Sequence, residues 1–184
     1  MAKHLHLASI ALALMAAQPA TPHILAESLP VKKGATPVEL RPDRTFRTTE
    51  LVAELLDWIV ASTDYAPALP PPEIVFCETG DCIPYETGTV IVGETLNGAY
   101  DRHNARIVLI RPWDVTDTRD QSILLHELVH HVQLGNRDFD CLAATELEAY
   151  RLQDAYLSQH GIASGFDWSQ INLLSSCPPA AHSR

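Results

Sequence analysis

The segment from residue 119 to residue 134 constrains the fold most, because residues able to bind an ion are embedded in an apolar helical pattern. It contains His126-Glu127-Leu128-Val129-His130, preceded by Asp117 or Thr118 as a helix cap and followed by Gly135-Asn136 as a stop. The apolar residues around the motif are those of a buried helix: Ile123, Leu124, Leu125, Leu128, Val129 and Val132. The sequence therefore predicts a helix that carries two histidines inside the domain.

His126 and His130 are four residues apart, a spacing that differs by about 40° of rotation and 6 Å of rise in a helix. Both side chains then project from one face and can share a zinc ion, which accepts imidazole nitrogens readily. Glu127 lies beside them, close enough to reach a metal-bound water as a general base. This is the H-E-x-x-H arrangement. Two surface histidines with a salt-bridging glutamate would instead predict polar neighbours.

A third ligand must come from elsewhere, because a catalytic zinc site normally has three protein ligands. The extended motif that ends in a third histidine is excluded, since Gln133 and Asn136 occupy its glycine and histidine positions. A following helix, at about residues 142–160, offers Glu146 and Glu148. The residues alone leave both glutamates open as ligands.

With these residues the sequence resembles the gluzincin type of zinc metallopeptidase, in which a helical E-x-x-A pattern downstream of H-E-x-x-H supplies the third ligand. The matching residues are Glu146-Leu147-Glu148-Ala149. The resemblance implies that Glu146 joins the two histidines in holding Zn²⁺, while Glu148, turned about 200° around the helix, faces elsewhere. The chain is also similar to small exported bacterial proteins that carry this motif.

The resemblance implies an activity as well: zinc-dependent hydrolysis of a peptide or related amide bond by metal-activated water, with Glu127 as base and then acid. Its substrate would be a peptide or protein. Tyr150 stands where related families often have an Asp that orients a zinc-bound histidine. It returns to the face of Glu146 and can assist catalysis by hydrogen-bonding a ligand or an oxyanion; an ordinary half-buried aromatic is the alternative. His131 is expected to be a polar neighbour.

A different class of protein also fits the motif. An exported zinc-binding or interaction protein could keep a peptidase-like fold without turnover. Nucleic acid is excluded as a partner, because the net charge is -10 and no basic stripe with interleaved aromatics is present. The sequence does not indicate an oligomeric state.

The rest of the chain predicts a small α+β, zincin-like domain over residues 48–184. Thr48 or Thr49 can cap a first helix with an apolar stripe from Leu51 to Val60. Residues 74–76, 89–92 and 106–110 have strand character and predict a sheet of about three strands. Residues 97–103 are expected to form a polar loop, where a substrate could add as a strand.

Residues 1–26 are predicted to be a signal peptide with an undetermined cleavage site, because an apolar run of about 11 residues follows a short polar start. The run is too short to span a membrane, which needs roughly 20 residues, so we expect an exported protein without stable membrane insertion. Residues 27–47 would be a flexible leader.

The four cysteines suit an oxidising compartment. Cys77 and Cys82 flank a turn-like tetrapeptide, which favours a local disulfide and leaves Cys141 to pair with Cys177.

Overall fold

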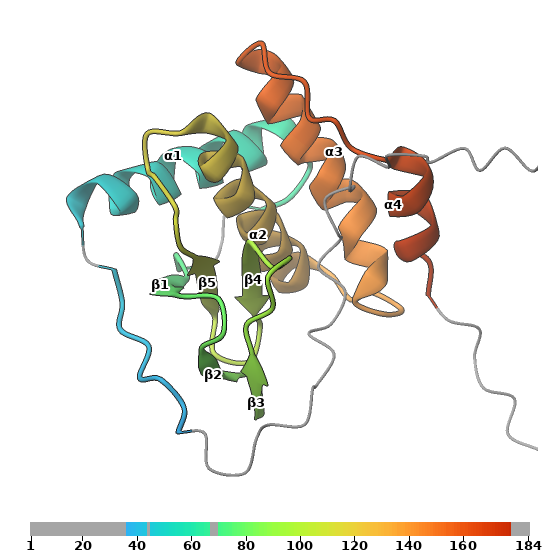
Figure 1. The fold of residues 1–184 in the computed structure, drawn as a ribbon. Helices are drawn as coiled ribbons and strands as arrows, with labels where there is room; N and C mark the ends of the chain where they lie inside the picture. The colour runs from blue at the N-terminus through green and yellow to red at the C-terminus, as the bar shows by residue number, and fades with distance from the viewer. Residues whose placement is uncertain (1–35, 44, 67–69, 178–184) are drawn as a thin grey trace, which may run out of the picture.

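The computed structural model describes residues 36–43, 45–66 and 70–177. These residues form an α+β fold, as predicted (Figure 1). Its elements, in chain order, are α1 (Phe46–Ser62), β1 (Glu73–Cys77), β2 (Cys82–Tyr85), β3 (Gly88–Ile91), β4 (Gly98–Asp101), β5 (Arg106–Ile110), α2 (Thr118–Asn136), α3 (Ala143–Gln159) and α4 (Trp168–Leu174). The predicted signal peptide, and residues 27–35 and 44 of the predicted leader, lie outside the described residues.

The main sheet has three strands in the order β1-β5-β4, with β1 parallel and β4 antiparallel to β5. The strand predicted at residues 89–92 is not part of it: β3 pairs with β2 in a separate two-stranded hairpin. Its place is taken by β4, in a segment expected to be a loop. β4 has only four residues and begins with Gly98, so pairing with the buried β5 and packing on α2 determine its structure rather than local propensity.

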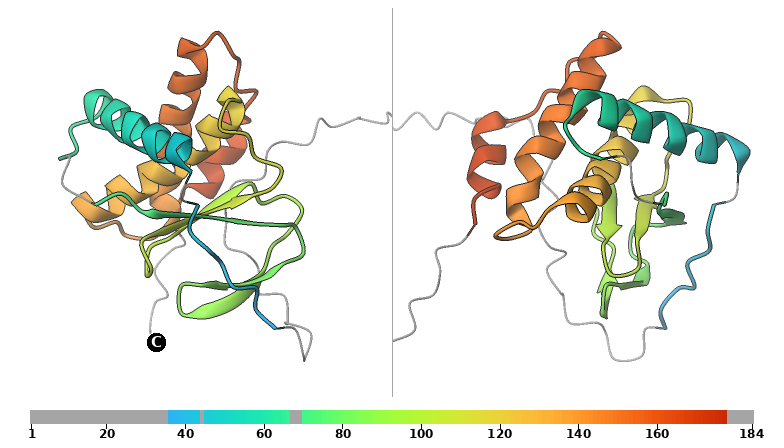
Figure 2. Two further views of the ribbon diagram at one scale, coloured as in Figure 1. Left: turned by 90° about the vertical axis from the view of Figure 1, so that its left-hand side faces the viewer. Right: turned by 180° about the vertical axis from the view of Figure 1, so that it is seen from behind.

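Strand β5 lies between two apolar clusters. Ile107 and Leu109 face the cluster formed with α1 and α2, whereas Val108 and Ile110 face a second cluster shared with the hairpin. Because both faces of β5 are buried, its residues are apolar without interruption. Figure 2 shows the helices on one side of the main sheet and the β2–β3 hairpin on the other.

The predicted helices are present with small differences. Helix α1 begins at Phe46, earlier than expected, and Thr48 lies inside its first turn with its hydroxyl 2.8 Å from that of Thr45. Asp117 caps α2 by accepting from two backbone N–H groups, as predicted, but the helix continues through the expected stop to Asn136. The short helix α4 was not predicted, because seven residues are too few to establish a periodicity. No helix among the described residues is long and apolar enough to cross a membrane.

One of the two predicted disulfides is present. Cys141 is bonded to Cys177, which ties the start of α3 to the segment after α4. The predicted bridge between Cys77 and Cys82 is wrong: both are buried free thiols. Cys77 ends β1 and pairs with Ile110 of the main sheet, while Cys82 begins β2 in the hairpin, so the intervening turn is closed by strand pairing and backbone hydrogen bonds instead.

Candidate metal centre

Helices α2 and α3 lie side by side and bring three buried side chains together (Figure 1). His126 and His130 from α2 and Glu146 from α3 each offer one ligand atom, and these atoms lie within 4.8 Å of one another. His126 Nε2 is 3.3 Å from Glu146 Oε2, and His130 Nε2 is 3.5 Å from Glu146 Oε1. The cluster could therefore hold a metal ion.

The orientation of His126 is set by a buried glutamine. Gln153 places its carbonyl oxygen 3.1 Å from Nδ1 of His126, while its Nε2 donates to Ser122 Oγ at 3.1 Å. The Ser122 hydroxyl in turn donates to the backbone oxygen of Arg119. Because the amide nitrogen faces Ser122, its oxygen must face His126, which puts the imidazole proton on Nδ1 and the lone pair on Nε2.

His130 is oriented by a second glutamine in the same way. The Gln133 carbonyl oxygen is 3.1 Å from His130 Nδ1, and its Nε2 donates to Thr145 O at 3.1 Å and to Glu148 Oε2 at 2.8 Å. Both histidines thus point a nitrogen lone pair at Glu146. A hydrogen-bonded Nδ1–H behind the ligating nitrogen is the usual arrangement of a metal-binding histidine.

The charge state of the cluster also fits a cation. Burial lowers the pKa of His126 to about 4, and burial together with the nearby His126 lowers that of His130 to about 4. Both imidazoles are therefore neutral near pH 7 and able to ligate. Two imidazole nitrogens and one carboxylate form a donor set that suits zinc.

Glu127 lies next to the cluster and is 1% exposed. Burial raises the pKa of its carboxyl well above the usual range, and the charge of Glu146 adds to the rise. The backbone N–H of Tyr100, which donates to Glu127, opposes this rise. A cation bound at the cluster would lower the pKa of Glu127 again, because an opposite charge favours the ionised form.

Strand β4 covers Glu127 at very short range. A Cβ atom added to Gly98 would lie 3.1 Å from Glu127 Oε1 and 3.1 Å from Ile123 Cγ2. Only a residue without a side chain permits this approach without a shift. Gly98 therefore sets how closely β4 packs against the helix that bears the histidines.

The outer edge of β4 carries further polar contacts. Ile110 N–H donates to Asn97 O, so Gly98 and Tyr100 lie at the positions whose backbone groups point away from β5. At this edge Tyr100 donates its N–H to Glu127 and accepts the Tyr85 hydroxyl at its carbonyl oxygen, at 2.9 Å. Burial, followed by the charge of Glu127, raises the pKa of Tyr85.

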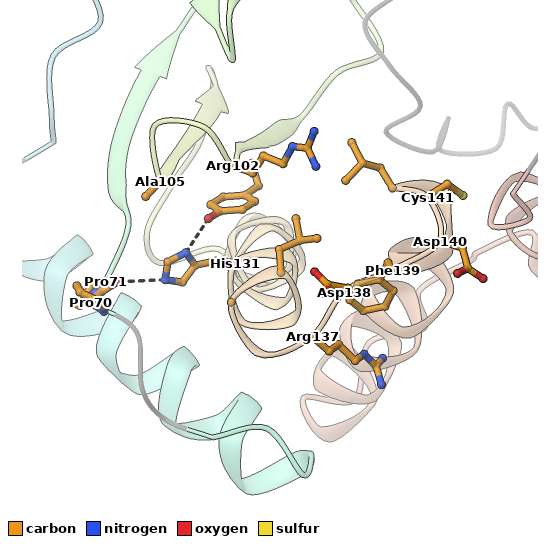
Figure 3. Close-up of a pocket in the computed structure, with 14 residues that line it drawn as sticks. Pro70, Pro71, Arg102, Ala105, His131, Arg137, Asp138, Phe139, Asp140 and Cys141 are labelled. Atoms are coloured by element: carbon orange, nitrogen blue, oxygen red, sulfur yellow. Dashed lines mark hydrogen bonds between the residues drawn. The ribbon is translucent and has the colours of Figure 1, made fainter.

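His131 connects α2 to its surroundings rather than to the ligands, as expected of a polar neighbour (Figure 3). Its Nδ1 is 3.0 Å from the Tyr100 hydroxyl and its Nε2 is 3.0 Å from Pro70 O. Since the Pro70 oxygen can only accept, Nε2 carries the proton and Nδ1 accepts from Tyr100. This contact borders a cavity of about 680 Å³ between β4 and the α2–α3 connection.

Tyr150 lies on the face of α3 that carries Glu146 and is buried. Its ring contacts that of His126 edge-on, with centroids 4.5 Å apart, and also contacts the ring of Phe166, with centroids 5.1 Å apart. The ring therefore supports His126 by packing, and its catalytic role stays a prediction.

Sequence reasoning missed several residues around the site. Gln133 and Gln153 lie three residues after His130 and seven after Glu146, spacings that share a helix face, so periodicity could have found them. No local signal identifies Tyr85, whose position depends on strand pairing. Tyr100 falls within the loop predicted at residues 97–103, but its contacts with Glu127 and His131 depend on the pairing of β4.

A buried centre of two histidines and one glutamate, with a second glutamate beside it, thus defines the chain as one with a candidate metal site. The chain belongs to the family described as a domain of unknown function, DUF6647, whose model matches residues 44–183. No curated protein matches the chain. No solved structure matches it either.

Proposed function

We propose that this protein is an exported zinc-dependent hydrolase of peptide or related amide bonds, with a zincin-like fold and a gluzincin-type site. One observation carries the proposal: two histidines with preset tautomers converge on Glu146 while a buried acid, Glu127, lies beside them. Hydrolysis needs an electrophilic centre and a proton carrier in contact, and this arrangement supplies both.

In the proposed mechanism His126, His130 and Glu146 hold the zinc. When bound, the metal supplies Lewis acidity toward water and the amide carbonyl. Glu127 accepts a proton from the attacking water and returns it to the leaving nitrogen. Its buried position beside the cluster suits this exchange, because burial raises the pKa of the carboxyl and a bound cation would lower it again, so both protonation states are within reach.

The outer edge of β4 favours an extended peptide as the substrate. Gly98 and Tyr100 direct backbone groups away from β5, and a peptide can pair with such an edge as an added strand. The N–H of Tyr100 is already donated to Glu127, so an added strand would pair with the carbonyl oxygen of Tyr100 and lie beside the proposed base. The Tyr85 hydroxyl at the Tyr100 carbonyl would have to share that oxygen with the substrate or leave it.

Export is supported by the disulfide between Cys141 and Cys177, since such bonds persist in oxidising compartments. The apolar N-terminal segment adds to this argument as a signal-peptide pattern.

Replacement of Glu127 by Gln tests the proposal. We expect hydrolysis to fall by about 10²- to 10⁴-fold, the usual contribution of a general acid–base residue. Zinc content should stay at about one ion per chain, because Glu127 is not one of the three ligands. Cleavage is followed with an unbiased peptide library and zinc by metal analysis, and Glu50→Gln, on the exposed side of α1, is the matched control.

Undiminished cleavage by the Glu127 variant would contradict the assignment of the base. A wild-type protein that binds one zinc but cleaves no peptide would favour a zinc-binding or interaction protein without turnover.

A further inference from the structure

Glu148 lies two residues after the proposed ligand Glu146 but faces the C-terminal part of α2. One carboxylate oxygen, Oε2, accepts three hydrogen bonds: from Tyr65 Oη at 2.5 Å, from Gln133 Nε2 at 2.8 Å and from Arg137 Nη2 at 2.8 Å. Its side chain is 36% exposed, so it connects the surface to the buried Gln133. Glu148 is thus not directed at the metal cluster, although the sequence left it open as a ligand.

The buried amide of Gln133 has two possible orientations, and Glu148 distinguishes them. In the observed one, its nitrogen faces two acceptors, Thr145 O and Glu148, and its oxygen faces His130 Nδ1. A flipped amide would place its oxygen against a carboxylate and its N–H groups against His130. The histidine would then carry its proton on Nε2, the nitrogen that faces Glu146, and could not ligate.

We propose that Glu148 is a positioning residue of the metal centre: it fixes the amide of Gln133 and thereby keeps His130 Nε2 available as a ligand. The proposal rests on the proposed zinc binding but not on hydrolysis. Removal of residues that orient a metal-bound histidine typically lowers metal affinity 10- to 100-fold. We expect an effect near the lower limit for Glu148, because Thr145 O still orients the amide when Glu148 is absent.

His126 provides an internal comparison. Its glutamine, Gln153, is held by the Ser122 hydroxyl, a group that can donate as well as accept. A carboxylate at position 153 could accept from His126, and from Ser122 once that hydroxyl turns away from Arg119 O. A carboxylate at position 133 would face the Glu148 carboxylate at the distance now spanned by a hydrogen bond. The same substitution should therefore be more damaging at Gln133 than at Gln153.

The experiment measures zinc affinity by competition with a chelator, using the oxidised protein. We expect Gln133→Glu to weaken zinc binding at least about 10-fold, and to weaken it more than Gln153→Glu does. Adding Glu148→Gln to Gln133→Glu restores a donor opposite the new carboxylate. This double variant should recover affinity to within about 5-fold of the wild type.

Two further measurements separate positioning from general destabilisation. The visible absorption spectrum of the Co²⁺-loaded protein reports the ligand set, and thermal unfolding of the metal-free protein reports the fold. Should Gln133→Glu fail to fold, Glu148→Ala serves instead and should weaken zinc binding about 10-fold. Tyr65→Phe removes a different bond to the same carboxylate and should leave affinity within about 2-fold.

A double variant as weak as Gln133→Glu, or a Gln133→Glu protein that binds zinc like the wild type, would overturn the proposal. Tight zinc binding with the expected rescue but without cleavage of any peptide would remove the proposed hydrolysis and leave the role of Glu148 intact.

Discussion

The two sides of the candidate site are built differently. The helical side, α2 and α3, supplies all three ligands from regular helices, and each histidine is held by a buried glutamine. The strand side, β4 with the neighbouring Tyr85, depends on a four-residue edge strand, one glycine and contacts between side chains and backbone. If the proposed function holds, the difference predicts that metal binding and substrate binding can be altered separately.

The largest expected effect comes from removing Glu146, the proposed ligand that faces both histidines on the helical side. Glu146→Ala should lower zinc affinity by more than about 100-fold, because loss of a ligand exceeds the 10- to 100-fold effect of an orienting residue. The matched variant is Glu148→Ala on the same helix. Chelator competition measures both, and a larger loss in the Glu148 variant would reverse their assigned roles.

The next effect concerns the bond that holds the start of α3. Cys141 and Cys177 are separated by 36 residues, so breaking this disulfide should cost about 3 to 4 kcal/mol of unfolding free energy in the chain-entropy model. Because Cys141 lies just before the helix that carries Glu146, zinc affinity should fall as well. Urea unfolding and zinc titration with and without reductant measure the two changes; unchanged zinc affinity on reduction would count against this link.

The strand side is tested by adding a side chain at Gly98, which lies against Glu127. Gly98→Val should reduce hydrolysis about 100-fold, the effect expected when catalytic groups are displaced by about 1 Å. Zinc affinity should not change, since no ligand lies on β4. Ala99→Ser, at the next position of the same strand, is the control. An equal loss of zinc binding in the Gly98 variant would show that the two sides are not independent.

The smallest expected effect comes from removing the contact between the strand side and the helical side. Tyr100→Phe removes the hydroxyl that donates to the buried His131 and should destabilise the protein by about 1 to 3 kcal/mol. Urea unfolding of the metal-free protein measures this change. Unaltered stability would mean that His131 does not hold β4 against α2.

The same contrast explains what could be predicted from the sequence. The spacing of His126 and His130 within an apolar helix predicts their shared face without any tertiary information. Glu146 follows from resemblance, and the structure places it with both histidines. β4 is not predictable in this way, because Gly98 and Ala99 have no strand preference and acquire their structure by pairing with β5.

The disulfides illustrate the same limit. Sequence proximity favours a bridge between Cys77 and Cys82, but strand pairing places them in different sheets. Cys141 and Cys177 are predicted to pair only because the other two cysteines are assigned to each other. The structure contains this disulfide.

The buried Cys77 thiol can be used to measure transient opening of the main sheet. Burial raises the pKa of Cys77 to about 12, so the thiol is both inaccessible and protonated in the folded protein. Alkylating reagents would label it only during transient exposure, and the labelling rate at Cys77, measured separately from that at Cys82, would report how often the sheet opens. Cys77 lies in the apolar cluster between the main sheet and the hairpin. Its labelling rate therefore measures the opening of the strands, and the measurement requires neither bound metal nor catalytic activity.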